Sequence, residues 1–200
     1  MLDLVCDLDR HRFCISWTNM RCLSDKESAV WCGEYGYPVM DVGYYGRPAP
    51  LVDEQFELIR FTYPIDSGQR VRLARDVVEW LAKSGGTELL FWVDQWDVWP
   101  RSQHLPVFAR FREAFGETRP LIQSPGHLFR VDELDDALSV LVVALLFIWD
   151  CHVFSAIRSP VFFCCHDEWS GLFVPPGYDP TLISTAFSSW LLKDDGVVSP

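Results

Sequence analysis

The chain has 200 residues, of which 49% are hydrophobic and 22% are charged, and its formal net charge at pH 7 is −11. This length suits one domain, and the apolar fraction is large enough to form a core, which argues against intrinsic disorder. The acidity, without a block of basic residues, excludes an obvious nucleic-acid-binding surface, because phosphates require clustered positive charge. A basic protein partner suits such a chain, although the acidity could also serve only solubility.

The first 50 residues are rich in loops. A helix is predicted to begin after Ser24, whose side chain forms a capping box with Glu27 three residues later. Glycines and prolines then interrupt a tyrosine-rich loop that contains Tyr44 and Tyr45. Such a loop either wraps the surface or takes part in recognition.

From residue 54 to residue 193 the hydrophobic pattern becomes regular. Segments with strand-like alternation or continuous apolar runs follow segments whose apolar residues recur at helical spacing. Predicted strands cover residues 55–63, 88–93, 120–123, 126–131, 151–156 and 160–165, and predicted helices cover residues 69–83, 102–115, 132–149 and 181–193. This order predicts a single α/β domain over residues 1–200, with a core over 54–193. We expect a mixed β-sheet covered by helices on both faces, with an antiparallel strand pair near the C-terminus.

Capping residues mark the starts of three predicted helices. Asp66, Ser102 and Asp132 each stand at a predicted N-cap, where a side-chain oxygen accepts a hydrogen bond from the first turn. The helix after Asp132 is apolar nearly all round over residues 137–149, so we expect it to be deeply packed. This run is too short to span a bilayer and ends at Asp150, so no membrane association is predicted.

The cysteines favour a reducing compartment. There are seven, an odd number, and acids stand near the N-terminus where a secretory signal would need bases. We therefore predict a cytoplasmic protein with free thiols. No C-x-x-C pair occurs, and Cys164 and Cys165 should point to opposite faces of a strand and be buried and inert. The sequence accordingly predicts neither a bound metal nor a cofactor.

Two loops at strand ends carry candidate functional residues, because sites in open α/β sheets collect at the carboxyl ends of strands. The first loop follows the strand at residues 88–93 and contains Asp94, Trp96, Asp97 and Trp99. Indoles beside acids suit a sugar platform, a cation cage or a protein-binding hot spot. The alternative is that both tryptophans fold back over the core while Asp97 caps a turn.

The second loop contains His166, Asp167 and Glu168. Together these side chains can supply a base, an orienting carboxylate and a metal ligand. Neighbouring residues diverge along a strand, so all three are not expected to converge, although a turn could bring two of them together. The alternative is an ordinary charged strand terminus. A composite catalytic site would require this loop to lie beside the loop of Asp94 and Asp97.

Motifs of common enzyme classes are missing. The sequence contains no P-loop, no G-x-G-x-x-G, no G-x-S-x-G and no H-E-x-x-H. Between residues 90 and 170 it instead carries the short motifs Trp96-x-x-Trp99-Pro100, Phe111-Arg112, Pro125 to Phe129, Trp149-Asp150 and His166 to Glu168. In this combination it resembles a family of small acidic, tryptophan-rich bacterial proteins with no established activity, some of them found near toxin genes. The resemblance implies a bacterial cytoplasmic protein with an immunity-type role and carries over no catalytic residue.

The sequence therefore favours a non-enzymatic, acidic protein-interaction module, of the immunity type, that neutralises a basic effector. One alternative is a hydrolase or metal-assisted enzyme that uses His166, Asp167 and Glu168 together with the acids of the first loop. Another is a structural subunit of a larger assembly. The predicted contact residues of the interaction module are Asp94, Trp96, Asp97, Trp99, Tyr44 and Tyr45.

Overall fold

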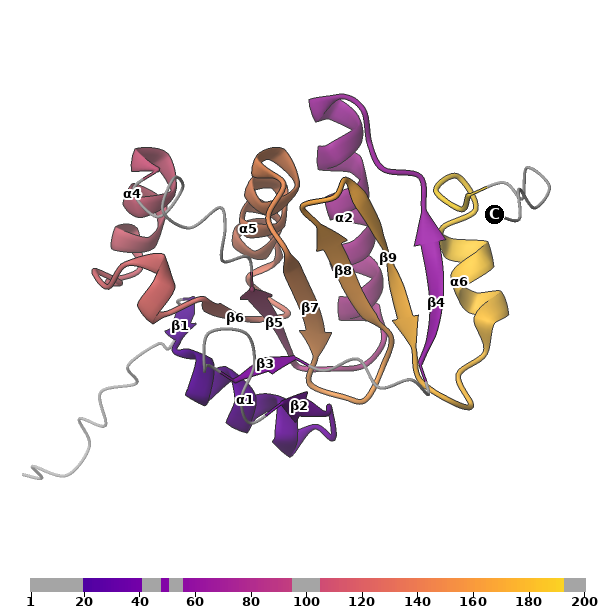
Figure 1. Ribbon diagram of the computed structural model, residues 1–200, viewed down its shortest axis with the longest axis horizontal. Helices are drawn as coiled ribbons and strands as arrows, with labels where there is room; N and C mark the ends of the chain where they lie inside the picture. Colours follow the sequence, from indigo (N-terminus) through magenta and orange to yellow (C-terminus); the bar gives the residue numbers. More distant parts are fainter. Residues whose placement is uncertain (1–19, 41–47, 51–55, 95–104, 193–200) are drawn as a thin grey trace, which may run out of the picture.

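The computed structural model describes residues 20–40, 48–50, 56–94 and 105–192. Within these residues, seven strands form one sheet in the order β1-β6-β5-β7-β8-β9-β4, and β2 pairs with β3 apart from it (Figure 1). The strands are β1 (Arg21–Leu23), β2 (Val39–Met40), β3 (Ala49–Pro50), β4 (Glu57–Phe61), β5 (Glu88–Val93), β6 (Gly126–Arg130), β7 (Cys151–Ser155), β8 (Val161–Cys165) and β9 (Trp169–Val174).

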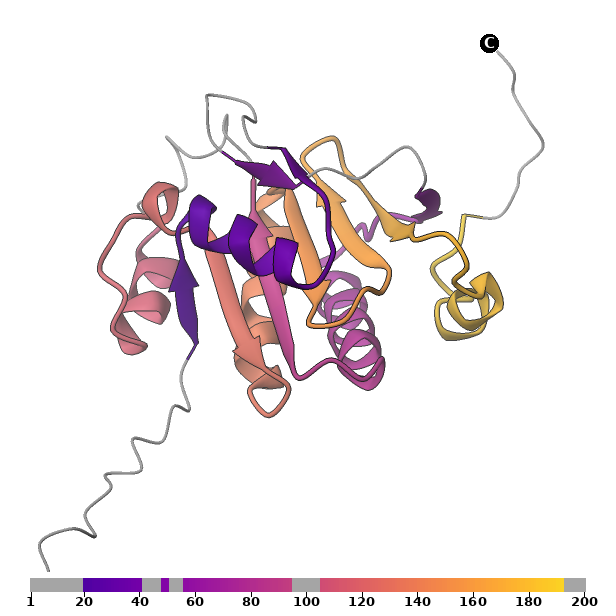
Figure 2. The same cartoon turned by 90° about the horizontal axis from the view of Figure 1, so that it is seen from below.

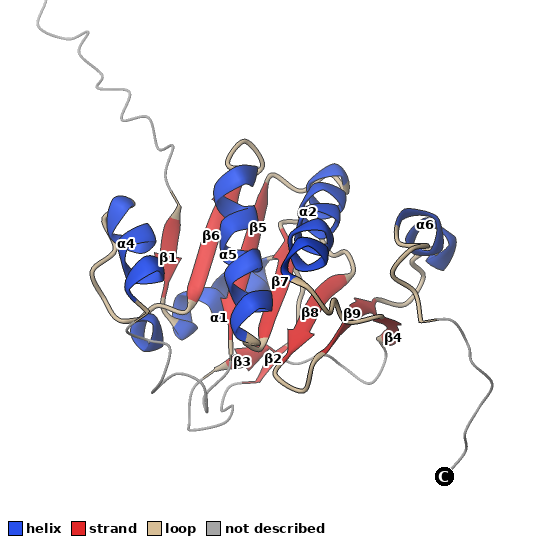
Figure 3. Ribbon diagram, turned by 90° about the horizontal axis from the view of Figure 1, so that it is seen from above, coloured by secondary structure: helices blue, strands red, loops and turns tan. Residues whose placement is uncertain are grey.

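The helices form two layers, one on each face of the sheet. α2, α4, α5 and α6 pack on one face, and α1 packs on the other together with the β2–β3 pair (Figures 2 and 3). The α/β class and the cover on both faces are therefore confirmed. The helices are α1 (Asp25–Glu34), α2 (Ser67–Lys83), α4 (Pro106–Ala114), α5 (Leu134–Phe147) and α6 (Pro180–Ala186).

The sheet departs from the expected mixed arrangement. Every pairing between its described strands is antiparallel. The helical crossovers do join strands that run in the same direction, since α5 connects β6 to β7 and α2 connects β4 to β5. However, β5 lies between β6 and β7, and three strands lie between β4 and β5. The two strands that each helix connects are therefore never neighbours. Strands of the opposite direction lie between them, and the sheet is antiparallel although strands and helices alternate along the sequence.

Two predicted helix caps are present in the structure. The Ser24 Oγ accepts from the Glu27 backbone N–H at 3.3 Å, and the Glu27 carboxylate accepts from the Ser24 N–H at 2.7 Å. Asp66 Oδ1 accepts from the Gln69 N–H at 2.8 Å and caps α2. These caps can be predicted from the sequence because a cap depends only on residues within one helical turn.

The two other predicted caps differ in outcome. α4 begins at Pro106 after Leu105, because proline is favoured at the first helical position, where no N–H is needed, and Ser102, the predicted cap, lies outside the described residues. α5 is preceded by Glu133, whereas Asp132 pairs with Arg130 at 3.0 Å.

Other predictions miss because tertiary pairing overrides local pattern. The segment predicted as a strand at residues 120–123 forms a short 3-10 helix, Leu121–Gln123, directly after Pro120. β1 and β9 were not predicted. α6 ends at Ala186 instead of continuing to residue 193, because the following chain pairs with β4 through Leu191.

Candidate functional site

The candidate site lies where β5 and β8 end and β7 begins. β4 and β8 point upward in Figure 1, and β7 and β9 point downward. Because β5, β8 and β4 run in the same direction, their C-terminal ends meet at one end of the sheet, which we call the β5–β8 end. The C-terminus of α5 reaches the same end, since β7 follows it after three residues, Ile148, Trp149 and Asp150.

Asp150 connects the two loops that carry the predicted site residues. Its backbone carbonyl accepts from the Asp94 N–H at 2.8 Å, at the end of β5. Its side-chain Oδ1 accepts from the His166 backbone N–H at 2.7 Å, at the end of β8. Two neighbouring strand spacings, together roughly 10 Å, separate β5 from β8. The described part of the first loop and the second loop are thus joined through Asp150, which the sequence reading did not include.

His166 and Asp150 form a directed pair. His166 Nδ1 lies 2.9 Å from Asp150 Oδ1 and 3.1 Å from Oδ2. An ionised carboxylate only accepts hydrogen bonds, so the ring donates from Nδ1. On the far side of the ring, Nε2 lies 3.5 Å from Asp167 Oδ1, and the imidazole is 40% exposed. An imidazole oriented by a carboxylate in this manner is suited to proton transfer or to binding a metal.

Cys165 completes the group but is not arranged as a nucleophile. Its Sγ lies 3.9 Å from His166 Nδ1, but this nitrogen already donates its hydrogen bond to Asp150. Burial, together with the nearby Asp150 and Asp167 carboxylates, raises the pKa of the Cys165 thiol to about 11, although the Asp167 N–H donates to the sulfur at 3.5 Å. The thiol therefore stays protonated at neutral pH, which opposes covalent catalysis.

Backbone strain surrounds this group. Ile148 and Glu168 are the two residues other than glycine with positive φ in the described part of the chain, at 56° and 58°. Ile148 stands two residues before Asp150, and Glu168 stands two residues after His166. A left-handed backbone is unfavourable for both residue types, and such strain concentrates at functional sites.

Glu168 provides a direct test of that strain. It closes the tight β8–β9 turn, where its N–H donates to the Cys165 carbonyl at 3.1 Å. We expect Glu168→Gly to raise the free energy of unfolding by about 0.5–1 kcal/mol, because glycine adopts positive φ without a Cβ penalty. The matched control is Asp167→Gly, which removes the same charge from a residue without positive φ. Urea denaturation should show no increase in the free energy of unfolding for the control. An equal increase in both variants would contradict backbone strain at Glu168.

A group of exposed apolar side chains adjoins the site. Ile65 is 88% exposed, and Phe147 and Leu146 at the end of α5 are 41% and 37% exposed. Arg70 joins their segments, since it donates to the Pro64 carbonyl and to the Leu146 carbonyl at 3.3 Å each. We call Ile65, Leu146 and Phe147 the apolar patch.

Tyr63 places the apolar patch beside the polar group. Its hydroxyl donates to the Leu145 carbonyl at 3.2 Å, which fixes the segment before Ile65 against the end of α5. Burial raises the pKa of Tyr63, and the charge of Glu168 acts in the same direction. The tyrosine is thus near enough to the β8–β9 turn to sense its charge.

The predicted site residues divide into two sets. Asp94, His166, Asp167 and Glu168 lie at the β5–β8 end of the sheet as described above. Tyr44, Tyr45, Trp96, Asp97 and Trp99 lie outside the described residues, so the structure does not place them.

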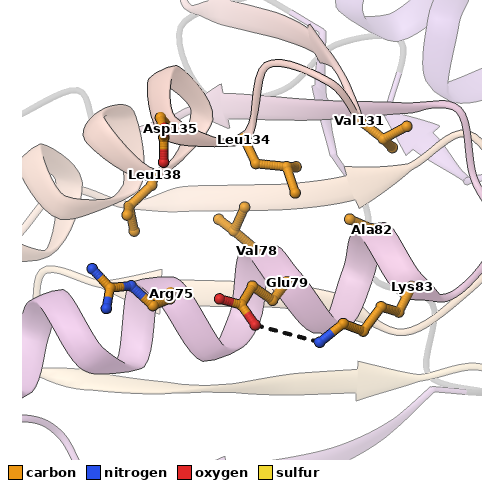
Figure 4. Close-up of a pocket in the computed structure, with 9 residues that line it drawn as sticks. All are labelled: Arg75, Val78, Glu79, Ala82, Lys83, Val131, Leu134, Asp135 and Leu138. Atoms are coloured by element: carbon orange, nitrogen blue, oxygen red, sulfur yellow. Dashed lines mark hydrogen bonds and ion pairs between the residues drawn. The ribbon is translucent and has the colours of Figure 1, made fainter.

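A separate groove lies between α2 and α5, toward the other end of the sheet. It has a volume of about 510 Å³, and Val78, Leu134 and Leu138 form its apolar part (Figure 4). Glu79 and Lys83 on its rim pair with each other at 3.3 Å. Because the rim carries charges of both signs, the groove shows no preference for a ligand of one charge.

Comparison with known proteins adds no relative: no family model, no curated protein and no solved structure matches this chain. The resemblance suggested by the short motifs therefore remains a prediction. Among the described helices, none combines the length and apolar character needed to cross a membrane.

Proposed function

We propose that this protein is a protein-interaction module that binds a basic partner through the β5–β8 end of its sheet. One observation carries the proposal, namely that the apolar patch of Ile65, Leu146 and Phe147 lies beside a set of carboxylates. Apolar anchors with a charged rim are the usual composition of a protein-binding surface. The rim carboxylates are Asp94, Asp150, Asp167 and Glu168.

The charge of the surface supports a basic partner. The Asp167 side chain is 72% exposed, and Glu168 beside it is exposed as well. The whole chain has a net charge of −11, so a cationic protein is attracted from a distance as well as at contact. Neutralisation of a basic effector, the immunity-type role expected from the sequence, is the specific form of this proposal.

Proton-transfer catalysis is the second candidate, and the His166–Asp150 pair is the observation that favours it. The composite site expected from the sequence needed the two loops to be adjacent, and Asp150 joins their described residues. Because the thiol of Cys165 is protonated and a poor nucleophile, the catalytic candidate is general acid–base chemistry with His166 as the base.

The interaction proposal is tested by capturing partners on the immobilised protein from cells that produce it, at low and high salt. We expect one stoichiometric basic protein whose binding weakens as salt rises. The double change Ile65→Ser and Phe147→Ser should weaken binding at least about tenfold, because exposed anchors lose their apolar contacts. The matched control is Val30→Ser, since Val30 is 63% exposed on α1, on the opposite face.

Two outcomes separate the candidates. Binding that survives the double change, or that Val30→Ser weakens equally, contradicts the proposed surface. The catalytic candidate is correct instead if the wild-type protein shows a hydrolytic activity in a substrate screen, and if His166→Gln and Asp150→Asn abolish that activity but leave partner binding intact.

A further inference from the structure

The ligand atoms of Asp150, Cys165 and His166 converge at the β5–β8 end. One atom from each, the carboxylate oxygen, the sulfur and Nδ1, lies within 4.8 Å of the others. The three residues come from two segments 15 residues apart, the start of β7 and the end of β8, so the convergence depends on tertiary structure. It is also a mixed group of oxygen, sulfur and nitrogen, unlike a surface cluster of acids.

We propose that Asp150, Cys165 and His166 bind a divalent transition metal ion of the zinc type. Thiolate and imidazole ligands together select zinc and its spectroscopic substitute cobalt over magnesium or calcium, which prefer oxygen. Three protein ligands with a fourth position for water are typical of catalytic zinc sites, whereas structural zinc sites have four protein ligands.

Two of the three ligand separations fit tetrahedral coordination with small adjustments, and the Cys165 sulfur lies within 4.8 Å of the Asp150 oxygen. Zinc bonds of about 2.3 Å to sulfur and about 2.0 Å to nitrogen or oxygen place sulfur and nitrogen about 3.5 Å apart, and nitrogen and oxygen about 3.3 Å apart. The observed separation of Cys165 Sγ and His166 Nδ1 is 3.9 Å, and that of Nδ1 and Asp150 Oδ2 is 3.1 Å. Each of these two pairs needs to move only a few tenths of an ångström. The metal ion takes the place of the Nδ1 proton between His166 and Asp150, this proton moves to Nε2, and the thiol proton of Cys165 is released to solvent, so that zinc binding lowers the pKa of the thiol that is protonated in the metal-free protein.

The surroundings orient these three side chains. Asp150 Oδ1 accepts from the His166 backbone N–H, which leaves Oδ2 for the metal ion. Asp167 lies 3.5 Å from His166 Nε2, the ring nitrogen opposite the proposed ligand atom. Metal-binding histidines characteristically donate this second N–H to a carboxylate, which fixes the tautomer. The Asp167 N–H points at Cys165 Sγ and stabilises negative charge on the sulfur.

The test uses the full-length protein freed of metal by a chelator and then titrated with Co²⁺ and with Zn²⁺. Co²⁺ should give the visible bands of tetrahedral cobalt together with a sulfur-to-cobalt charge-transfer band, and Zn²⁺ should displace both. Cys165→Ser should remove the charge-transfer band while circular dichroism shows an unchanged fold. Asp150→Asn and His166→Gln should each weaken Zn²⁺ binding at least about tenfold, by analogy with losses at comparable sites.

The control is Cys22→Ser, which changes a half-buried cysteine away from this group. It should leave the cobalt spectrum and Zn²⁺ affinity unchanged. The proposal is overturned if the wild-type protein shows no thiolate band with Co²⁺, or if the band persists in Cys165→Ser. It is also overturned if Cys22→Ser removes the band. Because none of these readouts involves a protein partner, their failure leaves the interaction proposal standing.

Discussion

Acidification should destabilise this fold steeply below about pH 6.5, because two histidines are buried in neutral form. Burial lowers the pKa of His127 and of His152 to about 3 each, from an ordinary value of 6.5. His127 packs against Phe108 with ring centroids 5.5 Å apart, and His152 packs against Phe163 at 4.3 Å. Among the described residues, no carboxylate acts on either ring strongly enough to offset the effect of burial on its pKa.

The direction in which stability changes with pH follows from proton binding. Between pH 6.5 and about pH 3 the unfolded chain protonates both histidines while the folded protein does not, so stability falls as pH falls. Each histidine contributes a slope of about 1.4 kcal/mol per pH unit once the pH is well below 6.5. Above that pH neither histidine changes the stability.

Urea denaturation between about pH 7 and about pH 5 measures this slope before most carboxylates titrate. His152→Phe keeps an aromatic ring beside Phe163 and should remove about half of the slope. The control Phe187→Leu should lower the stability equally at every pH, because this buried ring stacks on Phe61 away from both histidines and its loss removes packing but no titrating group. A slope that is unchanged in His152→Phe would contradict the neutral, buried state of that histidine.

Replacement of Arg112 by methionine should cost about 3 kcal/mol of stability, because buried hydrogen-bond acceptors would lose their donor. Arg112 is 4% exposed, and its guanidinium donates to the Arg119 carbonyl at 3.1 Å and to the Ser124 carbonyl at 2.9 Å. These bonds hold the segment between α4 and β6 in place. Methionine fills the space of the side-chain stem but donates nothing.

The matched control lies on the same helix. Arg110 is 83% exposed and pairs with Glu113 at 2.8 Å, so Arg110→Met should cost less than about 1 kcal/mol. Thermal or urea unfolding of the two variants decides between them. Equal losses in both would mean that the buried bonds of Arg112 contribute no more than a surface ion pair.

Local features of this fold were predictable from the sequence, and long-range pairings were not. The predicted strand at residues 88–93 coincides with β5, and Asp66 and Ser24 cap their helices, because these features depend on a few adjacent residues. The place of β5 between β6 and β7 depends instead on which strands meet after folding. Helical crossovers suggested parallel neighbours, and nothing in the local pattern shows which strands are inserted between them.

The candidate site shows the same division. The loop of His166 and Asp167 was predictable because polar residues follow an apolar strand. The role of Asp150 was not predictable, because in the sequence this residue is only an acid that follows a long apolar run. β7 and β8 pair with Cys151 opposite Cys164, and this register brings Asp150 to Cys165 and His166. Only the hairpin register reveals the group, and because β7 and β8 are buried on both faces, neither strand has the alternating pattern that would specify that register from sequence.

The central claim is that the β5–β8 end of the sheet is the working surface, and hydrogen exchange of the protein with its captured partner tests it most directly. The proposal predicts slower amide exchange in the complex at residues 63–65, 145–150 and 165–168, with no change in α1. Protection confined to α1 and β2, or to the groove between α2 and α5, would contradict the proposed surface and move the contact to that face.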